Sequence, residues 1–187
     1  KKVVAALSGQ IPSKFRFIDR RDLFVGLGTQ ADQSRGPGLP FPLADATPIV
    51  VDTHDSGYLG DSSAAVVAKA GFALIIDHHE IREATGELEL IDPSASSSCE
   101  LAYLVIKSLG IELPLDGAEA LFAGIVYDTG SFSYPKTDER TFECALELVR
   151  AGVNPYELHR RMYESSSDGV LVLQKVVISS LELAQEG

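Results

Sequence analysis

The sequence predicts an α/β fold: a largely parallel sheet with helices on both faces, followed by a helical segment. In the first half of the chain, short apolar runs alternate with helix-like stretches, an order typical of parallel sheets. The run at residues 72–76 is apolar at every position, as expected for a strand that is buried on both faces of such a sheet. From residue 97 onward, helical patterns dominate.

The predicted strands are short apolar segments, and some of them run directly into a carboxylate. They cover residues 3–7, 22–25, 48–52, 72–76 and 88–91. Residues 26–47 are rich in glycine and proline and show almost no periodicity. This composition predicts a long, mobile loop between the second and third strands.

Caps and glycines mark the predicted helices. Asp61 is expected to cap the first helix, and Ser97-x-x-Glu100 has the spacing of a capping box for the second. Proline directly after Asn154 is typical of a helix start. The predicted helices cover 61–70, 98–109, 116–126, a segment from residue 137 or 138 to the turn at 152, a segment after 154, and 168–185.

The last predicted helix, 168–185, is apolar on more than one face. Such a helix is either enclosed by its own domain or packed against something outside this sequence. We regard it as a possible interface with another domain or with a second copy in a homodimer.

Composition excludes several classes of protein. The chain has 16 Lys+Arg and 27 Asp+Glu, a net charge of −11, and such acidity disfavours long duplex nucleic acid as a partner. A hydrophobic fraction of 45% indicates a globular chain, and no apolar run approaches the roughly 20 residues of a membrane helix. Cys99 and Cys144 lack partners at metal-ligand spacing, so we expect reduced core thiols in a cytoplasmic protein.

Three acidic residues stand directly beside apolar segments. Asp52 and Asp77 end predicted strands, and Asp128 ends an apolar helix just before a glycine turn. In open parallel sheets, ligands bind at the carboxyl ends of the strands. A carboxylate beside a buried segment is costly unless it is paired or bound to a metal, and oxygen with imidazole ligands suits Mn²⁺ or Mg²⁺.

Histidines accompany two of these aspartates. His78 and His79 follow Asp77, and because successive residues at a strand end face opposite sides, the two are expected to do different jobs. His54, two residues after Asp52, is expected in a solvent-facing turn together with Asp55.

The motifs that carry these residues resemble the DHH phosphoesterase superfamily, RecJ-like, and within it the bacterial nanoRNase and 3′-phosphoadenosine-5′-phosphate phosphatase branch. The naming motif stands here as Asp77-His78-His79. Residues 91–101 (IDPSASSSCEL) resemble a second family segment, and residues 123–132 (AGIVYDTGSF) resemble a third. The resemblance extends from residue 49 to the C-terminus.

This resemblance implies a role for each residue of the predicted site. Asp52 would bridge two ions, Mn²⁺ or Mg²⁺, with His78 and Asp128 as further ligands. His79 would face the substrate phosphate as a catalytic residue, and Asp77 would orient a neighbouring imidazole. Bridged ions of this kind activate a water and neutralise charge on phosphoryl oxygens.

A serine run contributes one more candidate for the site. Ser97 and Ser98 lie at the start of the second helix, where anions are favoured, and so are candidates for substrate binding.

The family's first metal-binding motif has no counterpart before Asp52. The chain starts at Lys1 and its only methionine is Met162, so we expect a piece of a longer protein that lacks its first strand and motif. We predict a DHH domain over 1–165 and a connector helix over 166–187 that leads to an absent substrate-binding domain. The piece itself is expected to be nearly inactive.

The resemblance implies a phosphoesterase acting on short oligoribonucleotides or a nucleoside 3′,5′-bisphosphate. Two alternatives remain open. A cyclic-dinucleotide phosphodiesterase would share the metal motifs, and a non-catalytic nucleotide-binding module would lack the first motif in its natural form.

Overall fold

The computed structural model describes residues 3–9, 11–27, 46–70, 72–80, 88–164 and 168–181, and the structural statements below concern these residues. The loop predicted over 26–47 falls largely on residues 28–45, which lie outside the described part of the chain.

The five described strands pair in parallel throughout, which confirms the predicted class of fold. They form two sheets: β1 (Ala5–Ser8) pairs with β2 (Phe24–Leu27), and the second sheet has the order β3 (Ile49–Val51), β4 (Leu74–Asp77), β5 (Leu88–Ile91). In the second sheet, β4 lies between the other two strands. The carboxyl ends of β3 and β4 are therefore neighbours, which brings the segments after them together.

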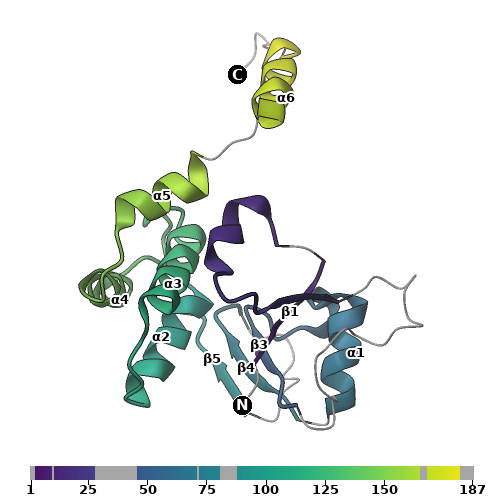
Figure 1. Cartoon of the computed structure of the whole chain (residues 1–187). Coiled ribbons are helices and arrows are strands. Elements are labelled where there is room, and N and C mark those ends of the chain that lie inside the picture. The colour runs from purple at the N-terminus through teal and green to yellow at the C-terminus, as the bar shows by residue number, and fades with distance from the viewer. Residues whose placement is uncertain are drawn as a thin grey trace.

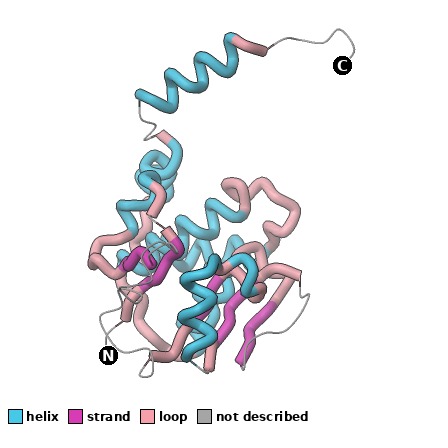
Figure 2. Tube along the Cα trace, turned by 90° about the vertical axis from the view of Figure 1, so that its right-hand side faces the viewer, coloured by secondary structure: helices cyan, strands magenta, loops and turns pink. Residues whose placement is uncertain are grey.

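Helices make up most of the remaining described chain. They are α1 (Gly60–Ala70), α2 (Ser98–Ser108), α3 (Leu115–Asp128), α4 (Glu139–Arg150), α5 (Pro155–Tyr163) and α6 (Asp168–Ser179), with short 3-10 turns η1 (Ser13–Ile18) and η4 (Ser56–Tyr58). Helix α1 lies to one side of the three-stranded sheet, and α2 and α3 lie to the other (Figures 1 and 2). The helices of the second half also pack against one another.

The caps confirm some predictions and correct others. The Ser97 side chain accepts a hydrogen bond from the backbone N–H of Glu100 (3.1 Å), so Ser97 caps α2 as predicted. The Glu100 side chain, however, bonds to Ser96 and not back to Ser97, so the predicted capping box is incomplete. A full box occurs at α4 between Asp138 and Thr141. Asp61 lies inside the first turn of α1, because that helix begins one residue earlier.

The hydrophobic core lies among the helices of the second half. Ile125 of α3 and Leu148 of α4 are fully buried, as is Ala118. Phe15 and Phe17 of η1 pack against the same cluster from the N-terminal part of the chain. Asp128, the last residue of α3, therefore stands at the end of a well-packed helix.

Helix α6 stands apart from this core (Figure 1). Its apolar side chains are exposed, with exposed fractions between 44% for Val170 and 66% for Ile178. The alternative in which its own domain encloses the helix is therefore wrong for the described chain. No helix in the described ranges is long and apolar enough to cross a membrane.

We expect Leu148→Ala to lower the free energy of unfolding by about 2–5 kcal/mol, because it leaves a cavity in the packed core. Leu146→Ala is the matched control on the same helix, since Leu146 is 49% exposed, and its cost should stay below about 1 kcal/mol. Urea denaturation measures both. Equal losses would show that α4 does not pack as described.

Candidate metal centre

Asp52 begins the site at the end of β3. Its backbone N–H donates to the carbonyl of Ile76 on β4 (3.0 Å), so the strand pairing fixes where the residue sits. Its φ angle is +66°, in the left-handed region that costs most non-glycine residues energy but that aspartate tolerates better. The side chain is 54% exposed, which leaves its carboxylate accessible to a ligand.

His78 lies between two carboxylates. Its Nε2 is 3.5 Å from Asp52 Oδ1 and 3.9 Å from Asp128 Oδ2, and its side chain is only 12% exposed. The other ring nitrogen, Nδ1, is 3.3 Å from the carbonyl oxygen of Ala95. The Nδ1 side of the imidazole thus contacts the backbone, and Nε2 faces the two carboxylates.

The structure gathers the predicted ligands at one place. Potential ligand atoms of Asp52, His78 and His79 all lie within 4.8 Å of one another, and Asp128 reaches the group through its approach to His78. The rings of His78 and His79 are 4.6 Å apart. His79, for which the family resemblance implied a contact with the phosphate, therefore lies close enough to be a ligand as well.

Asp77 is the fully buried member of the site. Its Oδ2 is 2.5 Å from His54 Nδ1 and its Oδ1 is 2.7 Å from His79 Nδ1. Oδ1 also accepts hydrogen bonds from the backbone N–H groups of His78 and His79. Burial alone would raise the pKa of Asp77, but the hydrogen bonds from the two imidazoles and the backbone hold it below its ordinary value. The carboxylate therefore stays charged.

The expectation for His54 was wrong. Its side chain is buried, 6% exposed, and it contacts Asp77 instead of solvent. The reason is that a buried carboxylate needs polar partners on each of its oxygens, and His54 supplies one of them. In the sequence, the charge of Asp77 at the end of an apolar strand indicates that a polar partner is needed. It does not indicate which residue is that partner.

The pKa of Asp128 is perturbed by its surroundings in the cluster. Burial, together with the negative charge of Asp52, raises the pKa of Asp128 to about 6. A divalent cation would relieve both effects, because it replaces lost hydration and neutralises the carboxylates. Carboxylate oxygens and imidazole nitrogens are also the donor set that Mn²⁺ accepts, so these residues fit such an ion.

The segment Asp128-Thr129-Gly130 forms a hydrogen-bonded turn at the end of α3. The Thr129 hydroxyl donates to the carbonyl of Ile125 (2.6 Å) and accepts from the N–H of Phe132 (2.9 Å), which closes the end of α3. Gly130 has φ +55°, and an added Cβ would lie 2.5 Å from the ring of Tyr134. The motif thus fixes the turn that holds Asp128 in place.

Cys99 lies where α2 and α3 approach closely. A Cβ added to Gly124 would lie 2.1 Å from Cys99 Sγ, so only glycine allows this approach. Burial, with the charges of Asp128 and Asp52, raises the pKa of the Cys99 thiol to about 12. In the metal-free chain the group is therefore a neutral thiol. Cys99 and Cys144 are both free, as predicted.

Ser97 and Ser98, the predicted candidates for substrate binding, lie at the buried start of α2. Their side chains are 0% and 6% exposed, and the Ser97 hydroxyl is engaged as the cap of α2. Neither hydroxyl is presented to solvent. Their role in substrate binding stays a prediction that rests on their position at a helix start.

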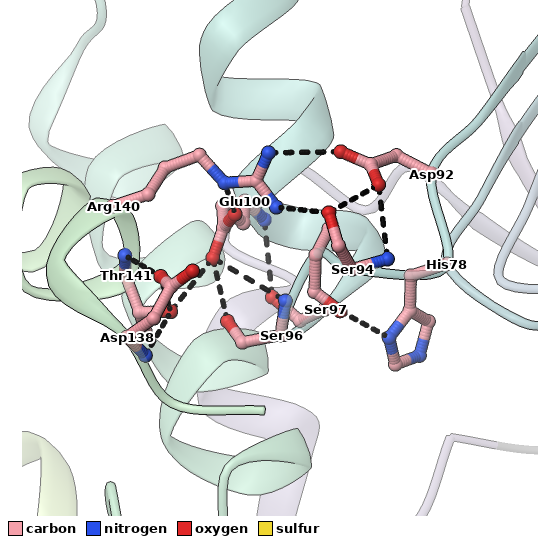
Figure 3. Close-up of polar contacts among 10 residues, drawn as sticks. His78, Asp92, Ser94, Ser96, Ser97, Glu100, Asp138, Arg140 and Thr141 are labelled. Atoms are coloured by element: carbon pink, nitrogen blue, oxygen red, sulfur yellow. Dashed lines mark hydrogen bonds and ion pairs between the residues drawn. The ribbon is translucent and has the colours of Figure 1, made fainter. Parts of the chain in front are cut away.

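Sequence reasoning missed a network of charges beside the site (Figure 3). Arg140 pairs with Glu100, which is fully buried (Nε to Oε1, 2.5 Å), and with Asp92 (Nη1 to Oδ2, 2.8 Å). The Thr141 hydroxyl donates to Glu100 Oε2 (2.9 Å). The network joins the end of β5, the start of α2 and the start of α4.

A parallel α/β fold whose strand ends gather carboxylates and imidazoles is the arrangement of a metal-binding α/β protein. The chain matches the DHH family, N-terminal domain, over residues 4–125. It belongs to this family of phosphoesterases, in which metal dependence is the rule.

Among curated relatives, the chain is 34% identical over 142 residues to the bifunctional oligoribonuclease and PAP phosphatase NrnA of Bacillus subtilis, covering 74% of this chain and 44% of that protein. It is 33% identical over 131 residues to the cyclic-di-AMP phosphodiesterase GdpP of Geobacillus thermodenitrificans, covering 67% of this chain and 20% of GdpP. The chain thus spans less than half the length of these relatives.

Among solved structures, an exopolyphosphatase-related protein from Bacteroides fragilis superposes with a TM-score of 0.84. The sequence identity is 21%, and the match covers 98% of this chain and 53% of the other. This likeness concerns the fold.

We expect Asp128→Asn to stabilise the metal-free chain at pH 7.5 by about 1–2 kcal/mol. The folded state holds the proton of Asp128 up to a pH of about 6, whereas the unfolded state releases it near 3.8, so the wild type loses stability as pH rises between these values. The gain from the asparagine should therefore disappear near pH 4. Thermal unfolding in EDTA measures it.

The control for this experiment is Glu143→Gln, which neutralises an exposed carboxylate. It should show no comparable gain at pH 7.5. A destabilised Asp128→Asn variant at that pH would contradict the described burial of the carboxylate beside Asp52.

Proposed function

We propose that this chain is the metal-binding part of a phosphoesterase that hydrolyses short oligoribonucleotides or a nucleoside 3′,5′-bisphosphate with Mn²⁺ or Mg²⁺. The observation that carries the proposal is the convergence of Asp52, His78 and His79 within 4.8 Å, with Asp128 beside them. The NrnA relative, an oligoribonuclease and PAP phosphatase by name, supports the substrate class.

The proposal gives each side chain a task. Asp52, His78 and Asp128 hold the cation, and His79 contacts the phosphate. Asp77 keeps the His79 ring in place through the 2.7 Å contact to its Nδ1. A bound divalent ion would supply Lewis-acid charge and activation of the attacking water.

A carboxylate behind an imidazole also has an electrostatic effect. Because Asp77 is ionised and fully buried, it accepts the hydrogen bond of the 2.7 Å contact from His79 Nδ1 and so orients that ring. His54, on the other oxygen of Asp77, keeps that carboxylate from rotating away.

The net charge of −11 favours small substrates over long nucleic acids in this proposal. Cations at the site would offset part of the local negative charge, so a short, diffusing phosphate ester can approach. We also propose that the protein is located in the cytoplasm and has no membrane partner.

We propose a division of the chain into a DHH domain over 1–165 and a connector over 166–187. The exposed apolar side chains of α6 support it, because such a helix needs a partner in the working protein. That partner is a further domain or a second copy of the chain.

A cyclic-dinucleotide phosphodiesterase is the second candidate function. It is favoured by the similarity to GdpP, a cyclic-di-AMP phosphodiesterase by name, over 67% of this chain. A third possibility, a non-catalytic nucleotide-binding module, would keep the cluster of side chains but lack turnover even when the natural flanking sequence is present.

We expect Asp52→Asn to weaken Mn²⁺ binding by the 187-residue chain at least tenfold, because it removes a charged oxygen ligand and keeps the shape of the side chain. Isothermal titration calorimetry or Mn²⁺ electron paramagnetic resonance measures the affinity. Glu112→Gln is the control, since Glu112 lies in the loop between α2 and α3, at the opposite end of these helices from the site. Equal affinity in all three proteins would overturn the proposed site.

Turnover separates the candidate functions. We expect the 187-residue chain to hydrolyse substrates weakly or not at all, because the described residues gather ligands for about one ion whereas two-metal catalysis needs a second set. A longer chain with its natural flanking sequence should hydrolyse short RNA or adenosine 3′,5′-bisphosphate with Mn²⁺, and should lose at least 100-fold in rate with Asp52→Ala or His78→Ala.

The same assay includes a cyclic dinucleotide. Faster hydrolysis of that substrate than of short RNA and the bisphosphate would favour the second candidate. An inactive longer chain that still binds nucleotides would favour the binding module. Strong Mn²⁺-dependent turnover by the 187-residue chain alone would contradict the expected inactivity.

A further inference from the structure

We propose that Arg140 is a positioning residue for the metal centre. It clamps the turn over residues 92–98, so that the Ala95 carbonyl holds the His78 ring with Nε2 toward Asp52 and Asp128. The proposal rests on the proposed function, because it takes His78 as a metal ligand.

His78 contacts the backbone at Ala95. A carbonyl oxygen can only accept a hydrogen bond, so His78 Nδ1 donates to it across 3.3 Å. The proton then resides on Nδ1, and the lone pair of Nε2 faces the carboxylates at 3.5 and 3.9 Å. The position of one backbone oxygen therefore sets both the tautomer and the direction of the ring.

The turn that carries this oxygen is itself held by hydrogen bonds. The Ala95 N–H donates to the Asp92 carbonyl (3.0 Å), and Asp92 Oδ1 accepts from both the N–H and the hydroxyl of Ser94 (2.9 and 2.5 Å). The Asp92 N–H in turn donates to the Asp77 carbonyl (3.1 Å). On this side, the turn is organised around the Asp92 carboxylate.

On its other side, the turn is organised around Glu100. Glu100 Oε2 accepts from the hydroxyl and the N–H of Ser96 (2.6 and 3.4 Å). Ala95 thus lies between two residues, Ser94 and Ser96, that are each fixed by a carboxylate. Ala95 itself is fully buried and has no side-chain polar group with which to fix its own position.

Arg140 connects the two carboxylates (Figure 3). Its Nη1 lies 2.8 Å from Asp92 Oδ2, its Nη2 donates to the Ser94 hydroxyl (3.3 Å), and its Nε lies 2.5 Å from Glu100 Oε1. The rigid, planar guanidinium hydrogen-bonds to Asp92 and Ser94 and forms an ion pair with Glu100, a combination that the single ammonium of a lysine cannot reproduce.

The helix that carries Arg140 is itself fixed. Arg140 lies in the first turn of α4, where Asp138 and Thr141 form a capping box. The Thr141 hydroxyl also donates to Glu100 Oε2 (2.9 Å). The guanidinium is therefore presented from an ordered helix start, and its side chain is 32% exposed, too little for a freely moving surface arginine.

A purely structural arginine would need only the contact with Glu100, because that carboxylate is the one fully buried charge in the network. The contacts with Asp92 and Ser94 add no core packing and lead to the turn that holds the Ala95 oxygen. The contacts of Arg140 therefore support the position of the Ala95 oxygen, and through it the orientation of the His78 ring.

The test is a double-mutant cycle on Mn²⁺ affinity in the 187-residue chain. We expect Arg140→Met to weaken Mn²⁺ binding roughly 10–100-fold, the usual effect of removing a group that orients a ligand. In the His78→Ala background, the same substitution should change the affinity less than twofold, because there is no ring left to orient.

Further variants guard against misfolding. Glu100→Gln combined with Arg140→Met avoids an unpaired buried charge, and Asp92→Asn cuts one arm of the clamp while the Arg140–Glu100 pair remains. Both should weaken Mn²⁺ binding only when His78 is present. Arg150→Met is the matched control, since it breaks an exposed pair with Glu147 on the same helix and should leave the affinity unchanged.

A second readout does not involve metal. Amide hydrogen exchange at Ala95 and Ser96 should be at least tenfold faster in Arg140→Met than in Arg150→Met, because the clamp holds both N–H groups in their bonds.

The outcomes separate this inference from the proposed function. If His78→Ala does not weaken Mn²⁺ binding, the proposed function fails and this inference with it. If His78→Ala weakens binding but the Arg140 variants do not, or if they weaken it equally with and without His78, the positioning role is overturned while the metal site stands.

Discussion

The buried carboxylate of Asp77 is the constraint around which the site is arranged. An ionised group with no exposure to water must have its oxygens satisfied by the protein, and here two imidazoles and two backbone N–H groups do so. These bonds fix the chain directly after β4, which is where His78 and His79 leave the sheet. They also draw His54 inward from the segment after β3. The parallel pairing of β3 with β4 then places Asp52 beside the same group. Sheet register and charge satisfaction therefore act together, and neither alone would bring these side chains into one place.

Two layers of support surround the acidic cluster and act through different kinds of force. Asp128 is held by packing, since α3 is anchored by Ile125 and its end is closed by the Thr129 turn. His78 is held by polar contacts through the backbone of the turn before α2. The cluster that results brings carboxylates close together, and burial with the charge of Asp52 raises the pKa of Asp128. Core packing and buried ion pairs thus offset the repulsion between carboxylates that lie close together.

Much of this architecture could be predicted from local sequence, and the part that could not depends on distant partners. The strand at Leu88–Ile91 matches its predicted range, and Ser97, Asp138 and Asn154 cap helices as their types and spacing indicate. The aspartates at element ends were recognisable because charge beside an apolar run is unusual. His54 was missed because its partner is 23 residues away, and Arg140 because Asp92 is 48 residues away. The separation of the strands into two sheets could not be predicted either, because an apolar run does not indicate which strand it pairs with.

The backbone of Asp52 has a consequence for how this site can change in evolution. With φ at +66°, the position accepts glycine, asparagine or aspartate far more readily than alanine, a β-branched residue or a bulky one. A lineage that stopped using the site would therefore drift first toward Asn or Gly here, because other replacements would disturb the sheet edge as well as the chemistry. Aspartate, asparagine and glycine are therefore the residues we expect at this position in relatives that keep this sheet edge, whether or not they keep the carboxylate.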